Sequence, residues 1–393
     1  MTFVYSLKNF KQNDADFFCD MVAYVSPRIE KTARNGSEIE VTCCTGYENE
    51  ICEKLDKLSD MIKEDSRSGR EIGVHTIIDN THIKPQNKGS VFDAMIEKGF
   101  VKEICSGVYA YSGLFLKVMR YFDRKIAEFA EEQFDTPIEF DFPVLYPVAD
   151  YEKGRYFETF PHHIMFQSNM KNDITVLDRF AKNGIGEQDI LNEMKTPQNV
   201  LRHAACVPVY AMMQNSVIKD DEPVCFLISG KCFRNEGTNV FELARLNEFY
   251  MKEYVFLGTP DSCAQRIEKA KSIWAHWTDV FSLNCKIETA NDSFFASNYK
   301  KLRKFQILGN SKQEFKVQIP FSGKYIACGS VNHHRTHFSK PYNITLESGT
   351  LCFTACFAFG IERLAYAFLS QKGIDPVLWD TASRTEIEQY IKL

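Results

Sequence analysis

The stretch Val224–Gly258, VCFLISGKCFRNEGTNVFELARLNEFYMKEYVFLG, decides the fold that the sequence predicts. It consists of two extended, largely apolar segments joined by a polar loop, which is the pattern of two strands and their turn. The first strand runs from Val224 to Phe233 and is followed by Arg234, Asn235 and Glu236. The second strand carries Arg245, Glu248, Phe249 and Glu253. Polar side chains are therefore expected to gather where the two strands meet their loop.

Two arginines and a phenylalanine in this stretch, Arg234, Arg245 and Phe249, suit a nucleotide. Guanidinium groups match phosphate oxygens, and a planar ring can stack on a purine. An ordinary hairpin with surface ion pairs is the alternative, since exposed pairs are common and weak. The stretch alone leaves both interpretations open, and a second stretch favours the first.

The second stretch is Phe353–Leu369, FTACFAFGIERLAYAFL. A short apolar run ends at Gly360, where a strand can meet a helix closely, and Arg363 then lies at the start of the helix. With this stretch the chain resembles the class II aminoacyl-tRNA synthetases. Their second signature is an Arg-x-Glu, a variable loop, an Arg and a Phe, and their third is a Gly-x-Glu-Arg that leads into a helix. Both are present in the same order, which implies an α+β fold with an antiparallel sheet flanked by helices.

The composition is that of an ordinary globular protein. The 393 residues are 44% hydrophobic and 25% charged, and they allow two or three domains. The net charge of −5 makes a small molecule or a protein a more obvious partner than a polyanion such as tRNA. Thirteen irregularly spaced cysteines, with no signal peptide, predict reduced thiols in the cytoplasm. No apolar run approaches the length of a membrane span, so no membrane partner is expected.

Residues 1–90 are expected to form a small α+β domain, with residues 91–393 as the catalytic domain. The expected order is strand, helix, strand, helix and strand, at Phe3–Leu7, Asp14–Thr32, Glu38–Thr45, Asn49–Glu64 and Glu71–Ile78. The polar segment Asn80–Ser90 is expected to be the linker. In outline the first unit resembles the N-terminal domain of archaeal-type seryl-tRNA synthetases. This unit has more acidic than basic residues, which argues against a tRNA-binding role.

Further elements follow from periodicity and capping residues. Gly113–Gln133 is expected to be a long helix with Ser112 as its N-cap, followed by an extended segment that Pro143 and Pro147 interrupt. The pair resembles the first class II signature, which implies a homodimer interface, and a plain core helix is the alternative. Strands are expected at Phe157–Phe166, Val207–Met213, Phe315–Pro320 and Tyr325–Val331, and a helix is expected at Asp261–Phe281, after Thr259 as N-cap.

Cys206, Glu253 and Cys356 are far apart in the sequence, and a lone cysteine is more often a small buried apolar residue. Their sequence context matches two related groups, the archaeal-type seryl-tRNA synthetases and the amino acid:carrier protein ligases. These groups use a Cys/Glu/Cys zinc site, so the resemblance implies that the three residues bind Zn²⁺. Two thiolates and a carboxylate suit this ion and leave one position open. By the same resemblance, the open position takes the α-amino group of a substrate amino acid, so Glu253 also belongs to the substrate site.

The resemblance to the amino acid:carrier protein ligases covers roughly residues 92–380. It includes the three zinc-ligand candidates and the segments Gly107–Tyr109, Asn291–Phe295 and Ser330–His334. These ligases adenylate a small amino acid and pass it to the phosphopantetheine thiol of a carrier protein. This chain differs in having residues 1–90, in Ser293 where the family usually has Pro, and in Ala296-Ser297 where Gly-Arg is common. The differences concern the acceptor and the substrate contacts.

The chemistry of adenylation implies roles for the nucleotide candidates. Arg234 and Arg363 are expected to stabilise the charge that develops on the α-phosphate of ATP. Glu236 is expected to accept a hydrogen bond from the adenine amino group, and Phe249 is expected to stack on the adenine ring. Arg245 is expected to reach the outer phosphates.

Other candidates lie on later segments. Three residues of one predicted strand, Cys328, Ser330 and Asn332, are expected near the phosphates or a Mg²⁺ ion. Asp292 is expected on the ammonium side of the substrate pocket, with Ala296 limiting its size; alternatively, Asp292 is a turn residue that bonds its own backbone. The histidines His333, His334 and His337 lack a defined metal-ligand spacing and are more often simply polar.

The favoured function is ATP-dependent activation of a small amino acid and its transfer to a carrier protein. A divergent archaeal-type seryl-tRNA synthetase is one alternative, with tRNA as the acceptor. A catalytically inactive paralogue that serves as a binding module is another. An inactive protein would not need the residues Arg234, Glu236 and Arg363. Their presence therefore argues against this alternative.

Overall fold

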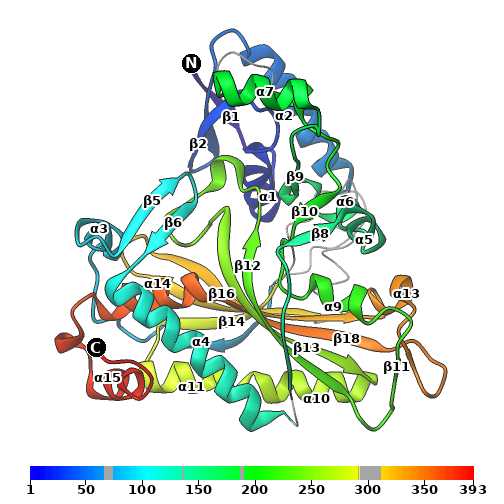
Figure 1. Cartoon of the computed structure of the whole chain (residues 1–393). Helices are drawn as coiled ribbons and strands as arrows, with labels where there is room; N and C mark the ends of the chain where they lie inside the picture. The colour runs from blue at the N-terminus through cyan, green and yellow to red at the C-terminus, as the bar shows by residue number, and fades with distance from the viewer. Residues whose placement is uncertain (66–73, 135–136, 186–189, 291, 293–310) are drawn as a thin grey trace.

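The computed structural model describes residues 1–65, 74–134, 137–185, 190–290, 292 and 311–393. A small N-terminal unit lies at the top of Figure 1, above a large sheet that crosses the lower half of the view. In the described part of the chain, buried apolar side chains cluster within the N-terminal unit and against both faces of the large sheet. Among the described helices, none is long and apolar enough to cross a lipid bilayer.

The N-terminal unit is a three-stranded antiparallel sheet with two helices. Its elements are β1 (Thr2–Ser6), α1 (Gln12–Val22), β2 (Ile29–Asn35), β3 (Glu38–Cys43) and α2 (Glu48–Asp65). The apolar stripe of α2 is buried in this unit's core and consists of Ile51, Leu55, Leu58 and Ile62. The helical spacing of the sequence therefore predicted α2 correctly.

Two expectations for this unit are wrong. The helix expected over Asp14–Thr32 ends at Val22, and Ile29–Asn35 is the strand β2. Pro27 lies between them, and proline interrupts a helix because it lacks the backbone N–H. The order is therefore strand, helix, strand, strand, helix, and the expected alternation of strands and helices is not formed.

The large sheet has the strand order β4-β14-β15-β16-β18-β13-β12-β7 in the described residues. Its strands are β4 (Thr76–Asp79), β7 (Ile138–Asp141), β12 (Val224–Phe233), β13 (Glu248–Gly258), β14 (Cys285–Thr289), β15 (Lys312–Ile319), β16 (Lys324–Arg335) and β18 (Phe353–Gly360). Neighbouring strands are antiparallel except at one edge, where β7 runs parallel to β12. The predicted sheet is therefore confirmed with one correction, because it is mixed and not wholly antiparallel.

The strand expected at Glu71–Ile78 does not belong to the N-terminal sheet. The described strand β4, Thr76–Asp79, pairs with β14 in the large sheet. The expected linker Asn80–Ser90 also contacts this sheet, since the backbone N–H of Asn80 donates to the backbone oxygen of Cys285 in β14 at 2.9 Å. The chain joins the large sheet before residue 90, so we propose that the domain boundary precedes β4.

Helices cover one face of the large sheet. They are α3 (Val91–Glu97), α4 (Gly113–Gln133), α10 (Pro260–Ala270), α11 (Ser272–Phe281), α14 (Ile361–Lys372) and α15 (Thr381–Glu388). Of these, α10 and α11 lie on the side away from the N-terminal unit (Figure 1). Alternate residues of β13 point to opposite faces. Tyr254 and Phe256 pack with these helices, whereas Val255 and Leu257 pack in the cluster on the other face.

The helix termini follow the sequence in part. The Thr259 hydroxyl accepts a hydrogen bond from the Ser262 N–H at 3.2 Å, so the predicted N-cap is confirmed. The helix expected over Asp261–Phe281 is instead two helices, α10 and α11, which meet at Lys271. Both bury the same apolar stripe, so spacing alone could not show the break. Ser112 precedes α4, but its hydroxyl donates to another loop and does not cap the helix.

A smaller layer lies between β7 and β12 in the sequence. Its elements are β8 (Leu145–Pro147), α5 (Val148–Lys153), α6 (Tyr156–Thr159), β9 (Met165–Gln167), α7 (Ile174–Asn183), α8 (Ile190–Glu193), β10 (Asn199–Leu201) and α9 (Val207–Met212). Strands β8, β10 and β9 pair with one another and not with the large sheet. The remaining short elements are β5 (Val101–Cys105), β6 (Val108–Tyr111), β11 (Val217–Ile218), α13 (Ser339–Tyr342) and β17 (Thr345–Leu346).

Two strands expected in the large sheet are therefore wrong. Phe157–Phe166 contains most of α6 and the first residues of β9, and Val207–Met213 is occupied by helix α9. Pro208 lies in the first turn of α9, where proline favours a helix start. The segment is apolar on all sides because most of it is buried, and this hides the helical period.

Candidate active site

The register of the large sheet brings distant residues onto one face. Val255 of β13 pairs with Cys356 of β18, and Cys356 pairs with Asn332 of β16. Residues directly opposite each other share a face, and so do residues two apart on one strand. Glu253 therefore lies on the same face as Cys356 and Asn332. Sequence reasoning could not supply this register, since it depends on which strands pair.

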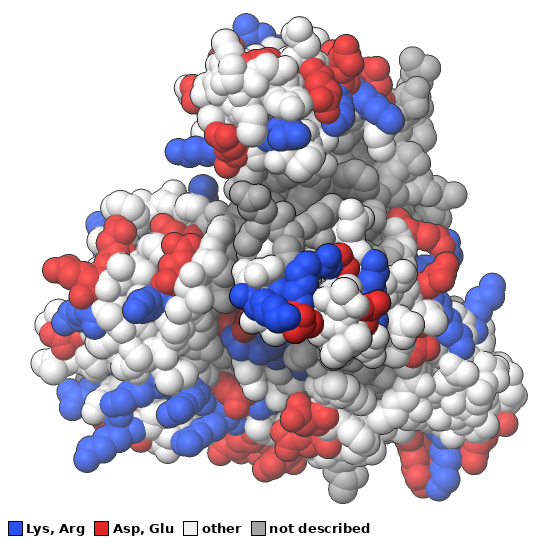
Figure 2. Space-filling view, turned by 45° about the horizontal axis from the view of Figure 1, so that its top comes forward, with Lys and Arg blue, Asp and Glu red and all other residues white. Residues whose placement is uncertain are grey.

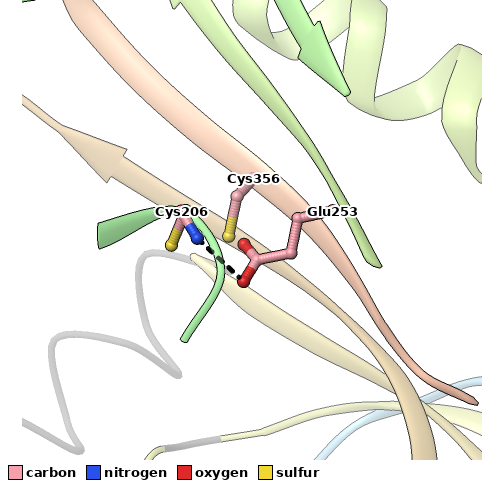
Figure 3. A group of neighbouring side chains, drawn as sticks. All are labelled: Cys206, Glu253 and Cys356. Atoms are coloured by element: carbon pink, nitrogen blue, oxygen red, sulfur yellow. Dashed lines mark hydrogen bonds between the residues drawn. The ribbon is translucent and has the colours of Figure 1, made fainter. Parts of the chain in front are cut away.

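Cys206, Glu253 and Cys356 meet at this face. Their two Sγ atoms and one carboxylate oxygen all lie within 4.8 Å of one another, and all three residues are buried. Figure 3 shows the three side chains pointing toward a common centre from three separate segments. Cys206 immediately precedes α9, and the backbone N–H groups of Ala205 and Cys206 donate to Glu253 Oε1 at 3.0 and 3.2 Å. These bonds fix the orientation of the carboxylate.

The chemistry of this group fits a metal ion. The hydrogen bond to Cys356, together with burial, raises the pKa of the Cys206 thiol well above its ordinary value. Burial also raises the pKa of the Glu253 carboxyl. Glu253 Oε2 is buried and has no hydrogen-bond partner within the part of the chain that the structure describes. A cation would satisfy this oxygen and favour the thiolate forms of both cysteines. Two thiols and one carboxyl are a donor set that suits Zn²⁺.

Two polar groups adjoin the Cys356 thiol. Asn332 Nδ2 lies 3.5 Å from Cys356 Sγ, and His334 Nε2 lies 3.6 Å from the same atom. The other ring nitrogen of His334, Nδ1, lies 3.2 Å from the Tyr210 hydroxyl. Burial, with the nearby His337 charge, lowers the pKa of His334 to about 3. Asn332, expected near the phosphates or Mg²⁺, thus contacts a metal-ligand candidate. His334 was considered with His333 and His337 and interpreted as simply polar, whereas in the structure it contacts the Cys356 thiol.

The nucleotide candidates Arg234 and Phe249 lie against each other. The Arg234 guanidinium carbon is 5.1 Å from the centre of the Phe249 ring, and Arg234 Nε donates to the backbone oxygen of His203 at 3.1 Å. Arg363 Nη1 donates to the backbone oxygen of Ala327 at 3.0 Å. Burial and the nearby charge of Arg234 lower the pKa of Arg363. The two half-buried arginines therefore concentrate positive charge in one place, where an anionic ligand would be favoured.

Glu236 and Arg245 form an ion pair in the loop that joins β12 and β13. Arg245 Nε lies 3.6 Å from Glu236 Oε2, and Glu236 is buried. The sequence placed Arg245 in the second strand, but β13 begins at Glu248. Arg245 Nη1 also lies 3.1 Å from Oδ1 of Asp20 in the N-terminal unit. The sequence analysis missed Asp20, and no sequence signal marks it, because the contact joins residues 225 positions apart.

The remaining candidates lie on the adjoining strands. Cys328 Sγ contacts the backbone oxygen of Arg363 at 3.5 Å, and the Ser330 hydroxyl lies 3.4 Å from Asn332 Nδ2. Asp292 forms an ion pair with Lys312, which is itself 3.2 Å from Glu314. The sequence offered a pocket role or a turn role for Asp292 and did not anticipate this partner. Ala296 lies outside the described residues, as do Asn291 and the segment 293–295.

A family model matches the part of the sequence that forms this site. It is the tRNA synthetase class II core domain (G, H, P, S and T), and it covers residues 192–372. The chain contains a class II tRNA synthetase core domain. The matched range holds the three metal-ligand candidates and both Arg234 and Arg363.

Two curated relatives are 28% and 27% identical to the chain over the aligned residues. The type-2 serine–tRNA ligase of Methanocaldococcus jannaschii is 28% identical over 258 residues, which is 63% of this chain and 50% of that protein. The amino acid–acyl-carrier-protein ligase 1 of Bradyrhizobium diazoefficiens is 27% identical over 300 residues, which is 74% of this chain and 88% of that protein. The chain thus spans about half of the first relative and most of the second.

Solved structures agree on the fold. The Methanopyrus kandleri seryl-tRNA synthetase in complex with Aquifex aeolicus tRNASec matches 99% of this chain and 77% of its own, with a TM-score of 0.72 and 20% identity. The cytoplasmic serine–tRNA ligase of Naegleria fowleri in complex with AMP matches 83% of this chain with a TM-score of 0.59 and 11% identity. The class II core domain and the N-terminal unit both lie within the first match.

Proposed function

We propose that this protein uses ATP to adenylate a small amino acid and then transfers the aminoacyl group to the phosphopantetheine thiol of a carrier protein. The observation that carries the proposal is the convergence of Cys206, Glu253 and Cys356 on the sheet face of a class II core domain that also holds Arg234 and Arg363. A set of zinc-ligand candidates in the same domain as two half-buried arginines suits a substrate that has an amine and a carboxylate.

Adenylation is an attack by the substrate carboxylate on the α-phosphorus of ATP, with pyrophosphate as the leaving group. The carboxylate is already ionised at neutral pH, so no general base is required. Negative charge develops on the α-phosphoryl oxygens, and Arg234 and Arg363 stabilise it from positions that backbone oxygens hold in advance. Glu236 and Phe249 bind the adenine, and Arg245 binds the outer phosphates. In the second step the carrier thiol attacks the carbonyl carbon, and AMP leaves.

The substrate amine is selected by the Cys206, Glu253 and Cys356 site. Zinc held by these three residues would supply a Lewis acid for the unprotonated α-amino group. Asn332 and His334 orient the Cys356 ligand through their contacts with its sulfur. Asp292, which pairs with Lys312, lies on the side of the substrate ammonium group. Mg²⁺ accompanies ATP near the strand that bears Cys328 and Ser330.

A carrier protein is the favoured acceptor, because the net charge of −5 makes a polyanion such as tRNA the less obvious partner. In the face drawn in Figure 2, acidic and basic side chains are interspersed over the N-terminal unit, at the top, and do not form a basic field. Binding to tRNA depends strongly on such fields. Transfer to tRNA is the second candidate, because the structural match to the tRNA-bound synthetase extends over the N-terminal unit.

We further propose that the protein is a homodimer that works in the cytoplasm. The edge strand β7 and the following segment expose the apolar residues Ile138, Phe140 and Leu145, which a second copy can cover. Each of the thirteen cysteines lies in the described residues and is a free thiol, as a reducing compartment would require. Light scattering after gel filtration tests the dimer, and a single-chain mass contradicts it.

Pyrophosphate exchange tests the proposed activation step. The purified protein is incubated with ATP, labelled pyrophosphate and one amino acid at a time, with glycine, alanine and serine first. Exchange that depends on a small amino acid is expected, and its absence with every amino acid means that the protein is not an activating enzyme. The amino acid that supports exchange is then supplied in labelled form with ATP, and a phosphopantetheinylated carrier protein and bulk tRNA are added in separate reactions. Label on the carrier supports the proposal, whereas label on tRNA alone supports the second candidate.

A further inference from the structure

The N-terminal unit is bonded directly to the loop that joins β12 and β13. Asn239 Nδ2 donates to the backbone oxygen of Asp20 at 2.8 Å, and the Tyr24 hydroxyl donates to the backbone oxygen of Asn235 at 3.1 Å. In the N-terminal unit, the acceptor Asp20 lies near the end of α1 and the donor Tyr24 lies in the turn that follows. The loop is therefore anchored at two points by a part of the chain more than 200 residues away.

The backbone of the loop also lies close to the N-terminal unit. Gly237 has φ of +55°, a conformation that glycine adopts readily, and a Cβ at this position would lie 3.1 Å from the backbone oxygen of Ala23. The approach leaves little room for a side chain. The contact is therefore built into the backbone of the loop as well as into its side chains.

Arg245 is the cationic residue between the N-terminal unit and the loop. Its Nη1 lies 3.1 Å from Asp20 Oδ1 and its Nε lies 3.6 Å from Glu236 Oε2, so two carboxylates from different units hold one guanidinium. Burial lowers the pKa of Arg245, but the charges of Asp20 and Glu236 outweigh it and raise the pKa overall. The Arg245 side chain is 31% exposed, so it is not enclosed by the two units.

We propose that Asp20 of the N-terminal unit is a positioning residue of the nucleotide site, which holds the Arg245 guanidinium in the orientation that receives the outer phosphates of ATP. The inference rests on the proposed function, in which Arg245 binds these phosphates. Long arginine side chains lose many rotamers when they bind, and a carboxylate that already fixes the rotamer removes part of that loss. The N-terminal unit thereby contributes to nucleotide affinity without contacting the nucleotide.

Titration calorimetry of the full-length protein with a non-hydrolysable Mg²⁺–ATP analogue and, separately, with AMP tests the proposal. Asp20→Ala is expected to weaken binding of the triphosphate by roughly threefold to fivefold, the range of a partly exposed ion pair, and to leave AMP binding unchanged. Asp20→Glu is expected to restore part of the loss. In an Arg245→Ala background, Asp20→Ala is expected to have no further effect, because it acts through Arg245.

Asp16→Ala is the matched control, because Asp16 lies on the same helix and pairs with Arg34 within the N-terminal unit. Equal weakening of AMP and the triphosphate, an equal effect of Asp16→Ala, or a further loss in the Arg245→Ala background would indicate a structural role and overturn the inference. Unchanged or tighter triphosphate binding by Asp20→Ala would overturn it as well. A wild-type chain that binds neither nucleotide overturns the proposed function together with the inference, so the two failures are distinct.

Discussion

The guanidinium of Arg234 lies over the ring of Phe249, with the guanidinium carbon 5.1 Å from the ring centre. The two residues come from neighbouring strands, since Phe249 pairs with Cys232 two residues before Arg234. A cation over an aromatic face is attracted by the negative face of the ring. The ring that is expected to stack on adenine therefore also fixes an arginine that is expected to stabilise the α-phosphate.

Phe249→Ala is expected to reduce amino-acid-dependent pyrophosphate exchange by about tenfold, because the variant loses both the stack on adenine and the support for Arg234. Phe249→Tyr keeps the aromatic face and serves as the control, with activity close to that of the wild type. The measurement is kcat/KM for ATP in both variants. Equal activity of the alanine and tyrosine variants would show that the ring has no part in nucleotide binding.

Cys356→Ala and Cys206→Ala are each expected to abolish zinc binding, which for the wild type should be about one ion per chain. The metal content is measured by elemental mass spectrometry after dialysis, independently of activity. Cys225→Ala is the matched control, because Cys225 is equally buried but lies in the core on the other face of the sheet. Zinc retained by both ligand variants, or a wild type without zinc, contradicts the assignment of the site.

Glu362 predicts a pH dependence of stability. Burial raises the pKa of its carboxyl to about 7, and both carboxylate oxygens accept from the Tyr250 N–H at 2.9 and 2.8 Å. Because the pKa is higher in the folded chain than in the unfolded chain, the folded state binds more protons between these two values. The stabilising contribution is therefore complete at acidic pH and is lost as the pH rises through about 7.

Glu362→Gln keeps a hydrogen-bond acceptor and removes the titration. The wild type is expected to lose on the order of 3 kcal/mol between pH 5 and pH 8 through this group, and the variant is expected to lack that part of the change. Urea unfolding at the two pH values measures it. The exposed Glu388, paired with Arg384, provides the control Glu388→Gln. The same pH slope in the wild type and in Glu362→Gln would refute the prediction.

Lys252 and Asp123 form an ion pair with unequal exposure. The Lys252 side chain is 4% exposed and the Asp123 side chain is 39% exposed, with 2.8 Å between Nζ and Oδ1. Asp123→Ala leaves a buried ammonium group without its carboxylate and is expected to destabilise the fold by about 2 kcal/mol or more. Lys252→Met leaves a carboxylate that water can solvate, so a smaller loss is expected. Thermal unfolding of both variants checks the order, and a larger loss for Lys252→Met would reverse the argument.

Sequence patterns predicted helices and strands best where the spacing of the apolar residues was regular. The strand Val224–Phe233 has the predicted bounds, and the helix expected after Gly360 is α14. Val207–Met213 was assigned wrongly because a segment buried on all sides shows no period. The strand expected at Glu71–Ile78 was assigned to the N-terminal sheet, whereas β4, Thr76–Asp79, pairs with β14 in the large sheet. The residues of a strand do not by themselves identify the strand that it pairs with. Local patterns therefore identified most elements, and pairing between distant segments had to come from the structure.

The candidate site divides in the same way. The sequence by itself determined the two strands and the helix of the class II signatures, because local periodicity and capping residues encode them. It also nominated Cys206, Glu253 and Cys356 through a resemblance, without showing that they meet. Only the tertiary structure decided that they meet, that His334 adjoins them and that Asp20 reaches Arg245. Contacts between remote segments depend on strand register and on the packing of whole units, and a linear sequence does not display either.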